Sequence, residues 1–205
     1  MQKKDTIIFD LGGVLIDRNP RYLYRKIFDD EGEMEWVSSK SATIPWNIAQ
    51  DTAAVLREAT NASHPRFPEY ESEISAYFSR WSEMIGGHYQ DVVKIQQSLI
   101  KNPAYRVVAL TNWSSQTFPW ALRNFPFLHD FEGILVSGEE KLAKPDPAIY
   151  QLLLKRFNID PDRAIFIDDS AKNIAGAWKE GITGHRYTDP ERLEEYLAKM
   201  GIEAF

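Results

Sequence analysis

The 205-residue sequence has no cysteine and only four histidines. Without cysteine there is no disulfide framework, no thiolate nucleophile and no cysteine-ligated metal site. The histidines, at positions 64, 88, 129 and 185, are dispersed and lack the spacing of a metal-binding set. A metal site in this protein would therefore rest on oxygen ligands, and the lack of cysteine suits a reducing cytoplasm.

The sequence also lacks long apolar runs and clusters of basic residues. Residues 1–6 lead directly into a short apolar strand, with no stretch long enough for a signal peptide or a membrane span. The 24 lysine and arginine residues are scattered and the net charge is −6, which argues against nucleic-acid binding. We therefore expect a cytoplasmic protein without a membrane or nucleic-acid partner. The 43% hydrophobic content suits one domain, or one domain carrying an insert.

A candidate nucleophile stands near the N-terminus, where the apolar run 7–9 ends at Asp10 and Gly12 and Gly13 follow. The β-favouring run predicts a buried strand, and the glycines allow a tight turn and close approach of a ligand to the backbone. A carboxylate presented in this way can attack phosphorus or carbon. Alone, the same pattern also fits a surface aspartate before a glycine-rich turn.

Three later segments place polar residues next to apolar strands or helices. Thr111 and Asn112 follow a strand, so the Thr111 hydroxyl and the Asn112 backbone N–H could bind phosphate oxygens. Lys144 precedes a proline-stiffened helix start and could serve as a counter-charge. Asp168 and Asp169 end another apolar strand. Taken one at a time, these residues also fit a turn, a helix cap or a solvated charge.

Helices and strands alternate from residue 88 onward, which predicts an α/β protein with a parallel sheet and helices on both faces. Ligands of such sheets bind at the carboxyl ends of the strands, where Asp10, Thr111 and Asp168 are expected. The predicted helices are at about 91–101, 115–124, 147–157, 171–180 and 190–199, and the predicted strands at 105–111, 132–136, 163–168 and 183–187.

Residues 18–86 break this alternation and favour helices. Apolar residues recur there at helical spacing, and a shorter helix is expected near 52–60. We interpret 18–86 as a helical cap domain inserted into a core domain formed by 1–17 and 87–205. Gly86 and Gly87, at the second junction, suit either a hinge or a helix C-cap. The spaced apolar residues are Tyr70, Ile74, Tyr77, Phe78, Trp81 and Ile85.

Together, four segments resemble, in order and spacing, the signature motifs of the haloacid dehalogenase superfamily of aspartate-nucleophile hydrolases. The resemblance spans residues 5–188 and is closest to small-cap phosphatases of the α-glucose-1-phosphatase type. It implies a Rossmann-like sheet with an inserted helical cap of the C1 type. The segments are Asp10-Leu11-Gly12-Gly13-Val14, Thr111-Asn112-Trp113, Lys144-Pro145-Asp146-Pro147 and Asp168-Asp169.

The resemblance also implies a Mg²⁺-dependent phosphatase acting on a small phosphorylated metabolite, such as a sugar phosphate. Asp10 would form an aspartyl-phosphate, and Thr111, Asn112 and Lys144 would hold the phosphoryl oxygens. The Mg²⁺ ligands would be the Asp10 carboxylate, the Gly12 carbonyl, and Asp168, Asp169 or both. A cation is also expected on physical grounds, because each close carboxylate pair would otherwise repel by roughly 4 kcal/mol. Oxygen-only ligands favour Mg²⁺ over zinc.

One departure from the family pattern concerns general acid–base catalysis. Most phosphatases of this superfamily carry a second aspartate two positions after the nucleophile, where this chain has Gly12. Such catalysis is typically worth about 10²–10⁴ in rate. The acid is then supplied by the cap or by metal-bound water. Alternatively, no general acid acts, and good leaving groups are favoured. Asp17 is a nearby candidate at the cap junction.

Two other functions remain open at this point. In a 2-haloacid dehalogenase, Asp10 would attack carbon without a metal, but members of that kind usually have an aromatic residue at the position of Gly12. A non-catalytic phospho-ligand-binding protein would not require the nucleophile that this chain retains. The sequence does not distinguish a monomer from a homodimer, and it does not identify the substrate.

Overall fold

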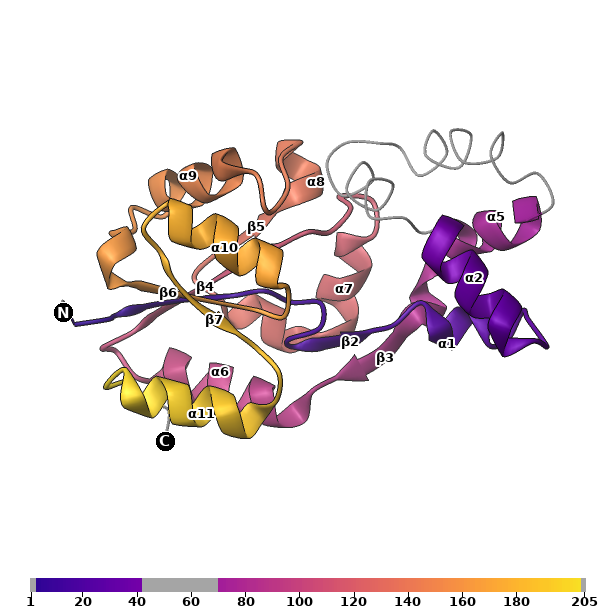
Figure 1. Cartoon of the computed structure of the whole chain (residues 1–205). Helices are drawn as coiled ribbons and strands as arrows, with labels where there is room; N and C mark the ends of the chain where they lie inside the picture. Colours follow the sequence, from indigo (N-terminus) through magenta and orange to yellow (C-terminus); the bar gives the residue numbers. More distant parts are fainter. Residues whose placement is uncertain (1–2, 42–69, 204–205) are drawn as a thin grey trace.

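The structure, a computed structural model, describes residues 3–41 and 70–203 and contains a five-stranded parallel sheet (Figure 1). The strand order is β5-β4-β1-β6-β7. The predicted α/β class and parallel sheet are therefore confirmed. The strands are β1 (Thr6–Phe9), β4 (Arg106–Thr111), β5 (Ile134–Val136), β6 (Ala164–Asp168) and β7 (Thr183–Arg186).

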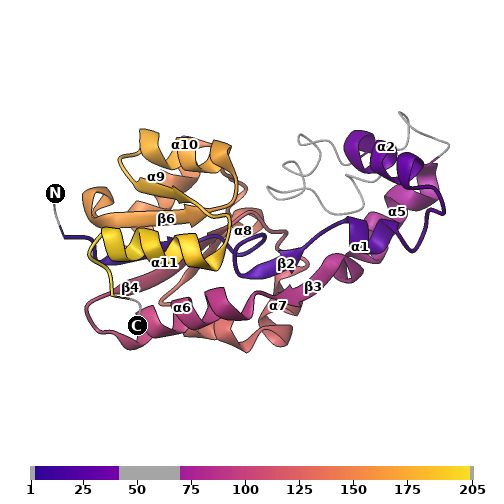
Figure 2. The same ribbon diagram turned by 60° about the horizontal axis from the view of Figure 1, so that its bottom comes forward.

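Helices cover both faces of this sheet. Successive residues of a strand point to opposite faces, so neighbours in β1 belong to different apolar clusters. Ile7 and Phe9 belong to one apolar cluster, with residues of α6, α7 and α11, whereas Ile8 belongs to another, with residues of α9 and α10. Figures 1 and 2 show these two layers on either side of the sheet. The helices are α6 (Gln90–Lys101), α7 (Phe118–Asn124), α8 (Ser137–Glu140), α9 (Pro147–Arg156), α10 (Ala171–Lys179) and α11 (Pro190–Lys199), with short 3₁₀ helices η4 (Pro126–Asp130) and η5 (Pro161–Arg163).

The register of the sheet brings the ends of three strands together. Phe9, the last residue of β1, pairs with Ala109 of β4 on one side and Ile167 of β6 on the other. The chain therefore leaves β1 at Asp10, between the ends of its two neighbours. This central position of β1 places the candidate nucleophile beside the residues that end β4 and β6.

A second, two-stranded sheet connects this core to a group of helices. β2 (Ile16–Arg18) pairs antiparallel with β3 (Ile85–His88), and this β2–β3 ribbon leads away from the main sheet (Figure 2). At its far end α1 (Arg21–Tyr24), α2 (Glu31–Ser41), α5 (Glu71–Ser79) and the 3₁₀ helix η3 (Trp81–Met84) enclose an apolar cluster of their own. The helix expected near 52–60 lies outside the described residues.

Local geometry differs from the sequence-based expectation at Gly86 and Gly87. They do not cap a helix but lie in β3, where Gly87 pairs with Asp17 of β2 and Gly86 lies at a shift in register, so the helix after Tyr70 ends at Ser79. The Asp17 carboxylate approaches the Gly86 backbone closely, since a Cβ there would lie 2.5 Å from its oxygen.

The helix predicted at 115–124 begins later, at Phe118, because residues 114–117 form a turn in which the Thr117 N–H donates to the Ser114 carbonyl at 3.1 Å. None of the helices in the described part of the chain has the length and apolarity needed to cross a membrane.

Candidate active site

Asp10 lies directly after β1, with only 7% of its surface exposed. Its Oδ1 accepts a hydrogen bond from the Leu11 N–H at 2.7 Å and pairs with Lys144 Nζ at 2.8 Å. The Asp10 backbone N–H donates to the Ile167 carbonyl at 2.8 Å. Main chain and side chain are therefore both held, so the carboxylate has a fixed orientation.

Lys144 is the buried counter-charge of this site and is 1% exposed. Besides Asp10, its ammonium group contacts Asp168 Oδ2 at 2.8 Å and the Leu110 carbonyl at 3.0 Å. A lysine ammonium has three hydrogen-bond donors, and all three have acceptors here. Lys144 thus ties the end of β1 to the ends of β4 and β6.

The charges of Asp10 and Lys144 depend on each other. Burial raises the pKa of Asp10, to about 8, while the nearby Lys144 acts to lower it. Burial also acts to lower the pKa of Lys144, but Asp10 and Asp168 outweigh it and raise that pKa above its usual value. A buried carboxylate in this position therefore needs positive charge around it to stay ionised.

Asn112 makes contacts that the sequence did not indicate. Its side-chain Nδ2 donates to the Lys144 carbonyl at 3.0 Å, and its Oδ1 accepts from the Lys144 N–H at 2.9 Å. The Asn112 side-chain amide thus pairs with both the backbone N–H and the carbonyl of Lys144. The sequence indicated only a backbone role for Asn112, because the pairing joins residues 32 positions apart.

Asp168 is fully buried at the end of β6 and surrounded by donors. Its Oδ1 accepts from the Ser170 N–H at 2.8 Å, and Asn173 Nδ2 lies 3.0 Å from both carboxylate oxygens. Tyr150 in turn donates to the Asn173 carbonyl at 2.8 Å. This network orients the carboxylate, and the part played by Tyr150 had no signal in the sequence.

A group of three carboxylates fits a metal ion. Asp10, Asp168 and the exposed Asp169 each offer one oxygen, and these oxygens lie within 4.8 Å of one another. Three negative charges face the single positive charge of Lys144, so a divalent cation would neutralise the cluster. Hard oxygen donors of this kind suit Mg²⁺. Gly13, with φ of +79°, allows Asp169 to approach, because a Cβ there would lie 2.5 Å from its Oδ2.

Thr111 and Gly12 complete the surroundings of Asp10. Thr111 is the last residue of β4 and is 1% exposed, and its hydroxyl has no hydrogen-bond partner in the described part of the chain. A Cβ at Gly12 would meet no atom within 4 Å. The position two residues after the candidate nucleophile therefore borders open space.

Asp17 is held within the β2–β3 ribbon. Its Oδ2 accepts a hydrogen bond from the Tyr22 hydroxyl at 2.7 Å, and its Oδ1 accepts one from the Tyr89 hydroxyl at 3.2 Å. These contacts give Asp17 a structural role at the junction with the helices of the 18–86 segment.

The chain is similar to several known proteins. A "phosphorylated carbohydrates phosphatase" of Thermotoga maritima is 23% identical over 188 residues, which cover 87% of this chain and 82% of that protein. A HAD family enzyme of Bacteroides thetaiotaomicron, solved with magnesium and inorganic phosphate, has a TM-score of 0.65 at 23% identity and covers 93% of this chain and 98% of its own. A solved dehalogenase has a TM-score of 0.75 at 18% identity, covering 97% and 99%.

At these low sequence identities, the similarity to the solved structures shows a shared fold and no more. The family follows from a different observation, since the model of the haloacid dehalogenase-like hydrolases matches residues 4–179, most of the chain. The chain belongs to the haloacid dehalogenase-like hydrolase family.

Proposed function

We propose that this hydrolase is a Mg²⁺-dependent phosphatase that acts on a small phosphorylated metabolite through an aspartyl-phosphate on Asp10. The observation that carries the proposal is the buried unit of Asp10, Lys144 and Asp168, with Asp169 completing a set of carboxylate oxygens within 4.8 Å. A protein that only binds phosphate would not need a buried, oriented carboxylate at the end of β1.

We assign the metal to the Asp10 carboxylate, the Gly12 carbonyl, and Asp168, Asp169 or both. When bound, Mg²⁺ supplies positive charge that offsets the repulsion among the carboxylates and between them and a phosphate group. Asp169 is exposed whereas Asp168 is buried, and Asp168 already accepts hydrogen bonds from Lys144, Asn173 and the Ser170 N–H.

We assign the first chemical step to Asp10 Oδ2, since Oδ1 is held by the Leu11 N–H and Lys144. Oδ2 forms a bond to phosphorus as the ester oxygen leaves with the bonding electron pair. Water then attacks the aspartyl-phosphate, which releases inorganic phosphate and restores the Asp10 carboxylate. The Thr111 hydroxyl and the Asn112 backbone N–H are the groups proposed to hydrogen-bond the phosphoryl oxygens, and Lys144 adds positive charge beside them.

The proposed substrate class rests on the absence of a general acid at position 12. Because glycine occupies position 12, no carboxylate next to Asp10 protonates the leaving oxygen, so the chemistry favours a leaving group of low basicity. An anomeric sugar phosphate fits this requirement, and the Thermotoga maritima relative is named for phosphorylated carbohydrates. We further propose that 18–86 is the cap that selects the substrate, that 1–17 and 87–205 form the core, and that the enzyme works in the cytoplasm.

The test is phosphate release from anomeric sugar phosphates, alkyl phosphates and p-nitrophenyl phosphate, with and without Mg²⁺. We expect metal-dependent release that is abolished in Asp10→Asn, with anomeric esters hydrolysed faster than alkyl esters. Comparable rates for both ester types would contradict the proposed substrate preference. No release from any ester by a folded protein would contradict the phosphatase proposal.

Dehalogenation is the second candidate, supported by the dehalogenase with a TM-score of 0.75. In that reaction Asp10 attacks carbon and halide leaves, and no metal is required. The open space at Gly12, in place of an aromatic residue, and the three-carboxylate group both argue against it. Halide release from a 2-haloacid that persists in EDTA would favour this candidate, and ester hydrolysis lost in EDTA would favour the phosphatase.

A further inference from the structure

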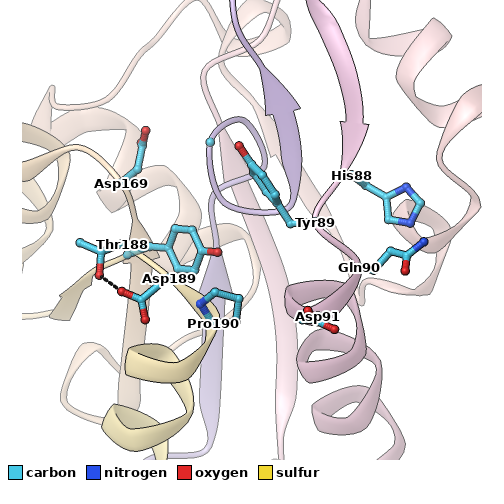
Figure 3. Close-up of a pocket in the computed structure, with 10 residues that line it drawn as sticks. His88, Tyr89, Gln90, Asp91, Asp169, Thr188, Asp189 and Pro190 are labelled. Carbon is cyan, nitrogen blue, oxygen red and sulfur yellow. Dashed lines mark hydrogen bonds between the residues drawn. The ribbon is translucent and has the colours of Figure 1, made fainter.

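A pocket of about 510 Å³ lies beside the candidate metal site, on the side of Asp169 and Gly13. In Figure 3, Asp169 and Tyr89 border its upper part, and Asp91 of α6 and Asp189 at the start of α11 lie below. Asp10, Thr111 and Lys144 do not line it. The pocket therefore meets the candidate catalytic site only at its edge and is separate from the proposed phosphate position.

Tyr187 contributes a hydroxyl that lacks a partner. The residue lines the pocket and is only 7% exposed, yet its hydroxyl has no hydrogen bond within the described residues. Burial raises the pKa of Tyr187 to about 12, so the hydroxyl is neutral at physiological pH. The hydroxyl is not among the buried polar atoms that lack a partner, so it reaches the space of the pocket, where a ligand can hydrogen-bond to it.

The charge of the pocket indicates what kind of ligand this is. Three carboxylates line it, those of Asp91, Asp169 and Asp189, and no lysine or arginine of the described residues does. The amino ends of α6 and α11 each contribute about +0.5 charge, which leaves the pocket negative. Asp91 and Asp189 pair with Lys94 and Arg192, whose side chains are 65% and 71% exposed, so solvent weakens both pairs. The Asp91 side chain is itself 68% exposed, so Asp189 is the less screened of these two charges.

We propose that this pocket binds an alkylammonium group, such as one end of a small aliphatic diamine. Its N–H groups donate to the Asp91 and Asp189 carboxylates and to the free lone pairs of the Tyr187 hydroxyl. The assignment rests on the excess of carboxylates in the pocket wall together with the unpaired hydroxyl. The same carboxylates disfavour an anionic phosphate ester in the pocket.

The test is calorimetric titration of the full chain with 1,4-diaminobutane, in saturating Mg²⁺ so that the metal occupies the Asp169 cluster. The matched neutral probe is 1,4-butanediol, which has the same chain length and hydroxyls in place of ammonium groups. We expect the diamine to bind, with an affinity that falls as salt is added, and the diol not to bind. Equal binding of both probes, or loss of diamine binding when Mg²⁺ is present, would overturn the proposal.

Two variants test whether the diamine binds in this pocket. Tyr187→Phe keeps the ring and removes the hydroxyl, so we expect about a fivefold loss of affinity, the effect of one hydrogen bond. Asp91→Asn removes one charge and should weaken binding about threefold. Glu195→Gln, an exposed residue of α11 outside the pocket, makes the same charge change and should leave the affinity unaltered. An unchanged affinity in both pocket variants, with the proteins folded, would refute the assignment.

Discussion

Gly12 stands where the sequence comparison with most phosphatases of this superfamily would lead us to expect a second aspartate, and the structure leaves room for that group. A Cβ there would meet no atom within 4 Å. We therefore expect Gly12→Asp to fold normally and to raise kcat/KM for alkyl phosphates by about 10²-fold, because a carboxyl group at this position can protonate the leaving oxygen. Steady-state assays check this.

Gly12→Asn is the matched control for this substitution, since its side chain has the same size and cannot transfer a proton in that way. The two variants should differ on alkyl phosphates and agree on p-nitrophenyl phosphate, whose leaving group needs little protonation. Equal rates for Asp and Asn on alkyl phosphates would show that general acid catalysis is supplied elsewhere.

Gly13 combines a positive φ with close contact to Asp169, and the two effects can be separated. Gly13→Ala should destabilise the fold by about 2 kcal/mol or more, through backbone strain and overpacking, and should weaken Mg²⁺ binding by displacing the Asp169 carboxylate. Gly201→Ala is the control, because Gly201 has φ of +74° and open space around it. It should lose only about 1 kcal/mol, with Mg²⁺ affinity unchanged.

Urea unfolding and Mg²⁺ titration of the two variants provide the measurement. A normal Mg²⁺ affinity in Gly13→Ala would remove Asp169 from the metal site and leave Asp10 and Asp168 as its acidic ligands.

Individual residues differed in how far the sequence could predict them. The places of Asp10, Thr111 and Asp168 followed from a general rule, since all three lie at the carboxyl ends of parallel strands. The contacts of Asn112 with Lys144 and of Tyr150 with Asn173 did not, because they join distant segments. Such pairings depend on how helices and loops pack, which periodicity does not encode.

Among the elements, the β2–β3 ribbon contains a glycine at a point of close side-chain contact. A Cβ at Gly86 would lie 2.5 Å from Asp17 Oδ2 and 2.7 Å from Tyr22 Cε2. Gly86→Ala should therefore break the Asp17–Tyr22 hydrogen bond and reduce the free energy of unfolding by about 1–3 kcal/mol. Gly12→Ala, which adds a methyl group in open space, is the stability control, and urea unfolding compares the two variants.

Hydrogen exchange would locate the effect of Gly86→Ala. Faster exchange should be confined to β2, β3 and the helices beyond them, with the main sheet unaffected. Uniformly faster exchange across the main sheet would instead show that the ribbon is part of the core's cooperative unit.

The sequence predicted the long helices, whose apolar residues recur over several turns, but it missed the two short strands of the ribbon. The helices α6, α9, α10 and α11 follow apolar periodicity and begin close to the predicted residues. β2 and β3 have three and four residues, and β3 contains two glycines that discourage a strand assignment. They form because Ile16–Arg18 and Ile85–His88 meet in space, which is information that local sequence does not hold.

At the scale of the whole molecule, separate apolar clusters indicate separate units of stability. Leu23, Tyr24 and Tyr77 belong to a cluster among the helices beyond the ribbon, and Trp81 packs against both this cluster and the one on a face of the main sheet. We predict that amides of α1 and α5 exchange through an opening of lower free energy than those of β1 and β4. Native-state hydrogen exchange checks this, and a single common opening energy would contradict division into cap and core.

The most direct test of the proposed chemistry is to trap the phosphorylated enzyme. Since no carboxylate at position 12 activates water, hydrolysis of the aspartyl-phosphate should be slow and the intermediate should accumulate. The protein is mixed with p-nitrophenyl phosphate and Mg²⁺, quenched in acid, digested and analysed by mass spectrometry. We expect a phosphoryl group on Asp10, absent in Asp10→Asn and after EDTA treatment. Phosphate release without a phosphorylated Asp10, or with the group on another residue, would contradict the mechanism.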